Sequence, residues 1–294
     1  MQVSARGVAI EVDDRGPPGA EPLLMIMGLG MQLTAWPEPL VDKLIARGFR
    51  VIRIDNRDAG LSQGFDAAGM PNLLWAALRH TMHLPVASPY RLSDMAGDAL
   101  GALDALNLPR VHVCGASMGG MIAQHLASAQ PQRVKSLTLM MTSSGARSLP
   151  HASPHLRRVL MSRPRGRGDD AVAAHLQHIL ELVGSPAYPA DPAAVHERML
   201  ASVRRAYRPA GTARQLLAIV ADGDRSPLLA RIGAPTCVIH GEADPLVPVL
   251  CGLDLTRRIA GAQADIVPGM GHDLPDALFD RFVSAIADNA ARAA

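Results

Sequence analysis

Three residue types that together activate a hydroxyl group occur in this chain in a fixed order. Ser117 stands in GASMG, Asp244 in HGEADP and His272 in PGMGHD. A serine hydroxyl is a weak nucleophile unless a base removes its proton. A histidine can be that base, and a carboxylate then fixes its tautomer and stabilises the imidazolium. The pattern predicts acyl transfer through a catalytic triad of Ser117, His272 and Asp244.

The sequence around the serine predicts a sharp turn between a strand and a helix. The apolar run VHVC at 111–114 precedes it and a helical pattern at 121–127 follows it. A G-x-S-x-G motif in this context holds the serine above the sheet on a strained turn, the nucleophile elbow. Gly115, Gly119 and Gly120 suit such a turn because the strand and helix pass close together. The unpaired N–H groups of the helix start favour negative charge.

The reaction also needs donors for the negative oxygen that forms on the substrate. The residue after the nucleophile supplies one backbone N–H, which is that of Met118. We expect the second from Leu29, in the loop after the first buried strand, where Gly28 and Gly30 let the backbone turn inward. These residues form the predicted oxyanion hole.

The same loops offer apolar groups that could contact a substrate. We predict that Gly28, Met31 and Met121 line the pocket. Such a pocket binds apolar groups and penalises charges that it cannot pair. Methionine is flexible and fits varied shapes. The expected substrates are therefore small to medium, neutral and largely apolar esters.

Short continuous apolar runs must position these loops. They are typical of strands that helices cover on both faces, as in a parallel sheet. The expected strands are 23–27, 51–55, 111–114, 137–141, 236–240 and 264–267. Apolar residues at helical spacing predict helices over 92–106 and near 278–286. Since open α/β sheets build their sites beyond the carboxyl ends of strands, the three triad residues are expected at one edge.

One stretch interrupts this alternation. Residues 144–225 contain no convincing strand and read as several helices separated by prolines and glycines. The division that follows is an α/β core of residues 1–143 and 226–294, with 144–225 inserted as a helical cap, or lid, over the carboxyl edge of the sheet. Below, "cap" means residues 144–225.

The motifs together resemble the α/β-hydrolase family, and within it esterases similar to aclacinomycin methylesterase. The matching segments, in order, are MIMGLG at 25–30, DNRDAGLS at 55–62, GASMGG at 115–120, GEADP at 241–245 and PGMGHDLP at 268–275. The resemblance implies an α/β-hydrolase fold with a mostly parallel eight-stranded sheet flanked by helices, a helical cap, and a triad at these positions. Many relatives have His-Gly where this chain has Met27-Gly28.

Other residues allow competing interpretations of the site. Glu242, Asp254 and Asp265 lie near Asp244 and could replace it as the acid. Residues 55–62 contain two carboxylates and an arginine, and we interpret them as a structural turn. Ser62, Ser143 and Ser144 lack the context of an elbow. His175, His178 and Glu181 share a helical spacing but fall outside the apolar stripe, which indicates a solvated face rather than a metal site.

Composition excludes several classes of function. The formal net charge is +2 and no long run of one sign occurs, so neither a nucleic acid nor a membrane is expected as a partner. Three cysteines without CxxC spacing argue against a disulfide framework or a zinc site. No signal peptide is recognised, which predicts a cytoplasmic location. The partner is a small-molecule ester, the chemistry needs no cofactor, and the oligomeric state stays open.

The predicted function is therefore a serine carboxylic-ester hydrolase that works through an acyl-enzyme on Ser117. Other reactions of the same triad stay open, namely those of a lactonase, thioesterase, C–C bond hydrolase, perhydrolase or acyltransferase. Dehalogenases and epoxide hydrolases of this fold are disfavoured because they use aspartate where this chain has Ser117. A non-catalytic small-molecule receptor on the same scaffold is the alternative from another class.

Overall fold

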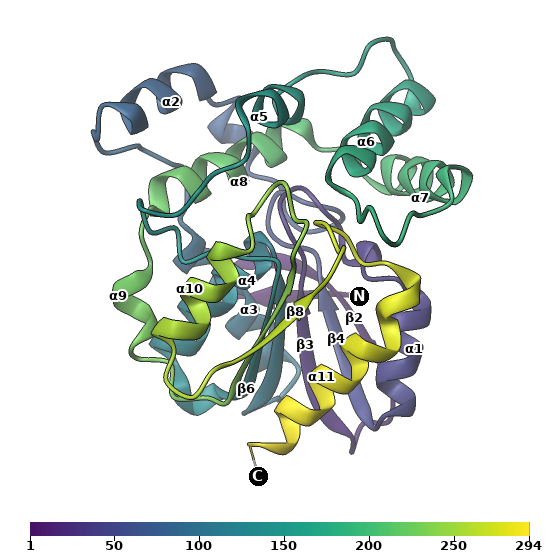
Figure 1. The fold of residues 1–294 in the computed structure, drawn as a ribbon, viewed down its shortest axis with the longest axis vertical. Helices are drawn as coiled ribbons and strands as arrows, with labels where there is room; N and C mark the ends of the chain where they lie inside the picture. Colours follow the sequence, from purple (N-terminus) through teal and green to yellow (C-terminus); the bar gives the residue numbers. More distant parts are fainter. Residues whose placement is uncertain (294) are drawn as a thin grey trace.

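A computed structural model describes residues 1–293, and a single eight-stranded sheet forms its centre (Figure 1). The strands are β1 (Gln2–Ala5), β2 (Val8–Arg15), β3 (Glu21–Ile26), β4 (Phe49–Ile54), β5 (Val111–Ala116), β6 (Val134–Met140), β7 (Thr236–Gly241) and β8 (Gln263–Val267). Their order across the sheet is β1-β2-β4-β3-β5-β6-β7-β8. The pairs β1–β2 and β2–β4 are antiparallel and all the others are parallel. The expectation of a mostly parallel eight-stranded sheet is confirmed.

The residue patterns predicted the six strands from β3 to β8 but missed β1 and β2. The predicted strands are continuous apolar runs, and every residue of β5 and β7 is buried. In β2, by contrast, the buried Ile10 and Val12 alternate with partly exposed residues. An antiparallel strand covered on one face shows such alternation, which a search for continuous runs overlooks.

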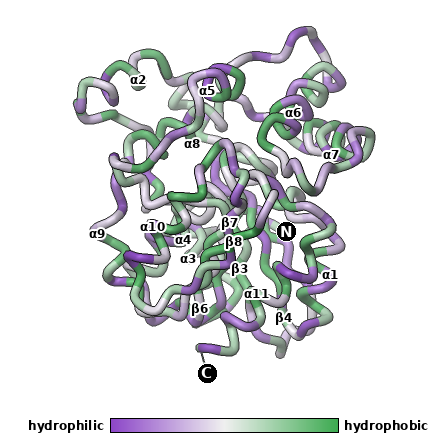
Figure 2. The backbone as a smooth tube through the Cα atoms, viewed as in Figure 1, coloured by the Kyte–Doolittle hydropathy of each residue, from purple (hydrophilic) through white to green (hydrophobic). Residues whose placement is uncertain are grey.

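Helices cover both faces of the sheet and separate two apolar layers. One layer includes α3 (Leu92–Ala105), α4 (Met118–Ala129) and α10 (Leu250–Arg258), and the other includes α1 (Glu38–Ala46) and α11 (Phe279–Ala291). The predicted stripe on α3 is buried, as are Phe282 and Ile286 on α11. Figure 2 shows hydrophobic residues along the strands and on parts of the helices around them.

The cap and the residues that flank it form helices and no strand. Residues 141–235, all of which the structure describes, include α5 (Pro154–Leu160), α6 (Asp169–Val183), α7 (Pro192–Arg205), α8 (Pro209–Asp222) and α9 (Ser226–Leu229), and no strand. The first four helices lie above one end of the sheet in Figure 1. A helix from outside the cap, α2 (Leu73–Thr81), packs against α8 on the same side. No helix in residues 1–293 is long and apolar enough to cross a membrane.

Candidate active site

Ser117 occupies a strained turn between β5 and α4. Its backbone has φ 54° and ψ −119°, a left-handed conformation that a residue with a side chain rarely adopts. The Ser117 N–H donates to the carbonyl oxygen of Met140, at the end of the neighbouring strand β6, at 2.9 Å. Strain of this kind persists only where the surrounding structure fixes it, and it concentrates at functional sites. The sheet therefore holds the predicted nucleophile.

The glycines around Ser117 have no room for a side chain. A Cβ on Gly119 would lie 2.0 Å from the carbonyl oxygen of Ile26, and one on Gly115 would lie 2.4 Å from that of Gly119. On Gly120 it would lie 2.6 Å from Cγ2 of Thr142. Helix α4 thus passes so close to β3 and β5 that only glycine fits. This is the physical reason for the motif.

His272 and Asp244 form a direct hydrogen-bonded pair. Nδ1 of His272 lies 2.7 Å from Oδ2 of Asp244. The other oxygen of Asp244, Oδ1, accepts from the N–H groups of Leu246 and Val247 at 2.9 and 2.8 Å. When Nδ1–H of His272 donates this hydrogen bond to the Asp244 carboxylate, the lone pair of the ring is on Nε2. That is the tautomer in which a histidine can remove a proton from serine.

The three competing carboxylates have other surroundings. Glu242 is exposed. Asp254 accepts from the hydroxyl of Ser144 and from Arg258, and Asp265 pairs with Arg281. Within residues 1–293 the carboxylate bonded to His272 is that of Asp244.

A second histidine, His240, lies next to Asp244 and was not predicted as a residue of the site. Its Nε2 donates to the carbonyl oxygen of Val247 at 2.7 Å and lies 3.6 Å from Oδ2 of Asp244. Burial lowers the pKa of His240, so the ring is neutral at pH 7. It closes the turn whose N–H groups hold Asp244. Its position at the end of β7, four residues before Asp244, was the available signal.

The loop after β3 lies against Ser117. A Cβ on Gly28 would lie 3.1 Å from Cβ of Ser117. The Met31 N–H donates to the Gly28 carbonyl oxygen at 3.2 Å, and the Gly30 N–H donates to Oε1 of Gln215 at 2.8 Å. Among the described residues the Leu29 N–H has no protein acceptor. Such a donor is free for a substrate oxygen.

The other predicted contact residues lie at different places around the loop. Met118 is the first residue of α4, and the N–H groups of a first helical turn have no acceptor within the helix. Met31 is partly buried against the apolar layer of α1 and α11, whereas Met121 packs against that of α3 and α4. The structure therefore does not bring Met31 and Met121 into one apolar cluster.

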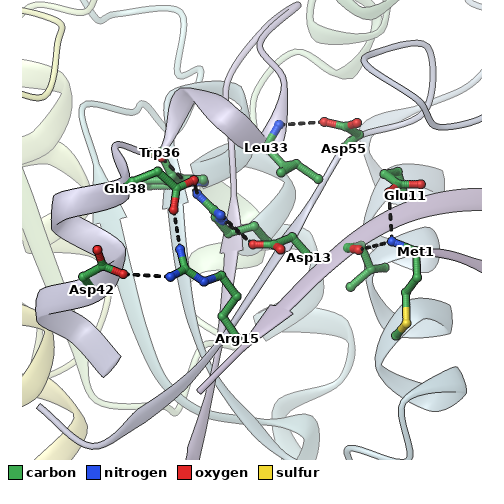
Figure 3. A network of polar contacts seen from close by, with 11 residues as sticks. Met1, Glu11, Asp13, Arg15, Leu33, Trp36, Glu38, Asp42 and Asp55 are labelled. Atoms are coloured by element: carbon green, nitrogen blue, oxygen red, sulfur yellow. Dashed lines mark hydrogen bonds and ion pairs between the residues drawn. The ribbon is translucent and has the colours of Figure 1, made fainter. Parts of the chain in front are cut away.

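Residues 55–62 act as a structural support, as the sequence indicated. Oδ1 of Asp55 accepts from the Leu33 N–H at 2.6 Å (Figure 3), and its Oδ2 accepts from the Leu61 N–H at 2.9 Å. Nδ2 of Asn56 donates to the Met27 carbonyl oxygen at 2.9 Å. Gly60 has φ 52°, and a Cβ there would lie 2.0 Å from Oδ2 of Asp55. The turn thus fastens both ends of the loop that begins at Met27.

The histidines of α6 lie on the exterior of the cap. His178 and Glu181 are exposed and His175 is half-buried, while Ala173 and its apolar neighbours pack against α7. Within residues 1–293 no group of three His, Cys, Asp or Glu side chains is arranged to hold a metal ion.

Fold and site together define a class of enzyme. Residues 21–275 match the family model described as the alpha/beta hydrolase fold, and the chain belongs to this family. The prediction of an esterase-like hydrolase is confirmed at this level.

Particular relatives refine the comparison. The chain is 29% identical to a rhodomycin D methylesterase of Streptomyces sp. (strain C5), over 92% of this chain and 91% of that protein. It is 30% identical to a 2-hydroxy-6-oxononadienedioate/2-hydroxy-6-oxononatrienedioate hydrolase of Cupriavidus pinatubonensis, over 90% and 84%. Among solved structures, a meta-cleavage product hydrolase from Pseudomonas fluorescens IP01 has a TM-score of 0.76 at 19% identity, over 100% of this chain and 98% of that one. The expected resemblance to methylesterases is confirmed.

Proposed function

We propose that this α/β-hydrolase is a serine carboxylic-ester hydrolase. The observation that carries the proposal is the hydrogen bond at 2.7 Å between His272 and the buried Asp244, together with a serine on a strained strand-to-helix turn. Asp244 holds His272 with Nε2 unprotonated, and Ser117 presents its hydroxyl at the start of α4. Each group then has the protonation state that acyl transfer needs.

The proposed reaction has two halves. Ser117 Oγ attacks the ester carbonyl while His272 Nε2 takes its proton, and the N–H groups of Leu29 and Met118 stabilise the oxyanion. The tetrahedral intermediate collapses, and His272 returns the proton to the departing alkoxide, which leaves an acyl-enzyme and an alcohol. A water molecule that loses its proton to His272 then releases the acid and restores Ser117. No metal or organic cofactor takes part in these steps.

The charges near the site favour neutral substrates. Arg205 of α7 contacts Gln32 in the loop after β3, and Arg214 of α8 contacts the turn at residues 55–62. They are paired with the buried carboxylates of Asp55 and Asp58. A substrate carboxylate would therefore compete with a buried aspartate for its partner. Gly28 lies beside Ser117, and Met31 and Met121, which pack against different apolar layers, are proposed to line separate parts of the pocket. Small to medium neutral esters fit a site with paired charges and apolar side chains. Methyl esters of bulky apolar acids are among them, and the similarity to a rhodomycin D methylesterase supports this choice.

The test measures hydrolysis of p-nitrophenyl acetate and butyrate by the wild type and by Ser117→Ala. Activity that disappears in the variant supports the proposal, and a fluorophosphonate adduct should map to Ser117. An adduct on Ser143 or Ser144 instead would show that the nucleophile is wrong. Tight ligand binding without turnover would identify the protein as a receptor.

The chain-length profile tests the substrate range. Each methylene that the pocket buries should contribute about 0.8 kcal/mol until the pocket is full. The rate from acetate to palmitate should therefore rise and then fall. A maximum at palmitate, or efficient amide cleavage, would contradict a capped site for small esters.

C–C bond hydrolysis is the second candidate, because relatives with that type of name match at up to 30% identity. The substrate in that relative's name is a dicarboxylate, which needs a free cation, and both Arg205 and Arg214 are already paired. Competition between such a dicarboxylate and a neutral methyl ester decides between the two functions.

We also propose a cytoplasmic location, since the three cysteines are free and buried.

A further inference from the structure

Hydrogen bonds from the turn at residues 55–62 hold the oxyanion loop, defined as residues 27–33, at its two ends. Asn56 holds its first residue through the Met27 carbonyl oxygen, and Asp55 holds its last residue through the Leu33 N–H. The residues between these points, which include the proposed donor Leu29, lie at the end of the sheet below the cap. Leu29 and Met31 pack against the core, and cap helices add hydrogen bonds to Gly30 and Gln32.

Helix α8 supports the middle of the loop through Gln215. Its Oε1 accepts from the Gly30 N–H at 2.8 Å, and its Nε2 donates to the Arg57 carbonyl oxygen at 2.7 Å. Both ends of the amide are thus used, and the side chain is fully buried. One turn earlier on α8, Thr212 fills the space beside Gly30, where a Cβ would lie 2.7 Å from its Oγ1.

The position of α8 against the core is itself fixed. Arg214 donates from Nε and Nη2 to the two carboxylate oxygens of Asp58, each at 2.7 Å, and neither side chain is more than 1% exposed. Burial acts to raise the pKa of Asp58, but hydrogen bonds from Arg214, the Phe65 N–H and Tyr90 outweigh it and hold that pKa below its usual value. A Cβ on Gly211 would lie 2.1 Å from the Asp58 carbonyl oxygen, so the helix backbone touches the core loop.

The end of α7 supports the second half of the loop. Nε2 of Gln32 donates to the carbonyl oxygens of Ser202 and Ala206 at 2.7 and 2.8 Å. Nη1 of Arg205 donates to Oε1 of Gln32 at 2.5 Å and lies 2.8 Å from Oδ2 of Asp55. Asp55 thereby connects the end of the oxyanion loop to α7 as well as to the core.

We propose that Gln215 and Arg205 are positioning residues that set the oxyanion hole from the cap. The side chain of Gln215 accepts the hydrogen bond from the Gly30 N–H, and the Gly28 carbonyl oxygen accepts the one from the Met31 N–H. This leaves the Leu29 N–H as the amide of residues 29–31 without a protein acceptor. Arg205 and Gln32 keep the following residues in place. The inference rests on the proposed function, in which Leu29 is an oxyanion donor, and it makes the cap a part of the catalytic machinery.

The first test replaces Gln215 by leucine, which is similar in size and cannot bond to Gly30 or Arg57. Labelling of Ser117 by a fluorophosphonate needs only the nucleophile, its base and the oxyanion hole. Loss of one oxyanion donor typically lowers turnover about 10²–10³-fold, so a displaced donor should slow labelling by at least about tenfold. The KM for p-nitrophenyl butyrate should change far less than kcat, because the donor acts mainly in the transition state.

A matched control separates positioning from loss of stability. Gln124 is likewise fully buried and makes two hydrogen bonds, to the Ser143 carbonyl oxygen and with Arg225, away from the oxyanion loop. Gln124→Leu should lower Tm as Gln215→Leu does while keeping the wild-type labelling rate. Equal slowing in both variants would overturn the proposal.

A second pair of variants tests the same idea at a less buried position. Arg205→Met removes the bonds to Gln32 and Asp55, and Arg205→Lys keeps a cation there. The methionine variant should slow labelling several-fold and the lysine variant should restore part of the rate. Arg204→Met, at the exposed neighbouring position, is the control. If Gln215→Leu does not fold, the Arg205 variants test whether the cap positions the oxyanion loop.

The outcomes separate this inference from the proposed function. Wild-type labelling rates in both Gln215→Leu and Arg205→Met would overturn the positioning role, whatever esters the enzyme cleaves. Rapid labelling of Ser117 in a wild type that hydrolyses no ester would instead refute the proposed function. In that case the labelling rates of the variants still decide whether the cap sets the oxyanion hole.

Discussion

The proposed nucleophile and the oxyanion loop lie against each other, yet different parts of the chain hold them. Ser117 is fixed by the sheet, through its N–H to Met140 and through glycines pressed against β3 and β5. The middle of the oxyanion loop is fixed by Gln215, which lies 185 residues away in sequence from Gly30. The elbow is held by its neighbouring strands and by Thr142, just beyond β6. The loop is hydrogen-bonded to α8, so changes in that helix should reach the chemistry through it.

The acid and the base show the same division. The turn after β7 holds Asp244. The backbone of His272 is tied to the cap, since its N–H donates to the carbonyl oxygen of Val183 at 2.7 Å, at the end of α6. Ser185 adds bonds to the Gly271 N–H, at 2.8 Å, and to Asp273, whose pKa is raised by burial. The proposed nucleophile and acid are thus held by the core, whereas the proposed base and the oxyanion loop also contact the cap.

The largest expected loss of activity comes from a substitution at Asp244, which the core holds. Asp244→Asn keeps the shape of the side chain but lets His272 adopt the wrong tautomer. In a well-studied serine protease this change cost about 10⁴ in kcat, and a loss of that order is expected here. The measurement is kcat/KM for p-nitrophenyl butyrate, with circular dichroism to verify folding. Glu242→Gln is the matched control at an exposed carboxylate. If that variant were the inactive one, the acid would be misassigned.

Gly119→Ala tests how rigid the elbow is. Its Cβ would lie 2.0 Å from the Ile26 carbonyl oxygen, and backbone of a central strand cannot move aside. Overpacking in a close-packed interior typically costs about 1–3 kcal/mol and sometimes more. We expect a large drop in Tm and little active enzyme, with no single side-chain substitution that restores it. A variant of normal stability and activity would show that the elbow is softer than its contacts indicate.

Gly30→Ala makes the parallel change in the oxyanion loop and should be milder. Gly30 has φ 66°, where a non-glycine residue costs about 1–2 kcal/mol, and its Cβ would meet the side chain of Thr212 rather than backbone. A side chain can be trimmed, so Thr212→Ala should recover part of the lost kcat of Gly30→Ala. Comparison of kcat for the single and double variants measures this coupling. Purely additive effects would mean that α8 does not influence the loop through this contact.

The same division explains what could be predicted from the sequence. The elbow, the strands β3–β8 and the order Ser117, Asp244, His272 rest on local patterns, because neighbouring residues in the chain create the strained turn and the buried strands. The contacts of Gln215 and Arg205 join residues about 150 to 185 positions apart, and no spacing rule indicates them. The two glutamines at positions 32 and 215 look like ordinary polar residues until the fold buries them. Strand β2 was missed for a different reason, since its alternating pattern reflects a single covered face.

The smallest expected effect concerns His240, which supports the acid from within the core. Burial holds its pKa below the 6.5 of an exposed histidine. His240 in the unfolded chain therefore binds a proton as the pH falls through about 6.5, whereas His240 in the folded protein stays neutral there. The contribution of His240 to the free energy of unfolding is therefore fully present above that pH and is lost as the pH falls below it. The slope reaches at most about 1.4 kcal/mol per pH unit for one group.

His240→Gln keeps a donor for the Val247 carbonyl oxygen and removes the titration. Urea unfolding at pH 7.5 and 5.5 should show a smaller loss of free energy of unfolding in this variant than in the wild type. His112, whose pKa burial also lowers, lies away from the triad on β5, and His112→Gln is the matched comparison. Both variants should flatten the pH dependence of stability, but only His240→Gln should also alter kcat at pH 7.5, because only that ring closes the turn around Asp244. Equal kcat in the two variants would show that Asp244 does not depend on His240, and that the turn amides of Leu246 and Val247 hold its carboxylate for His272 without that ring.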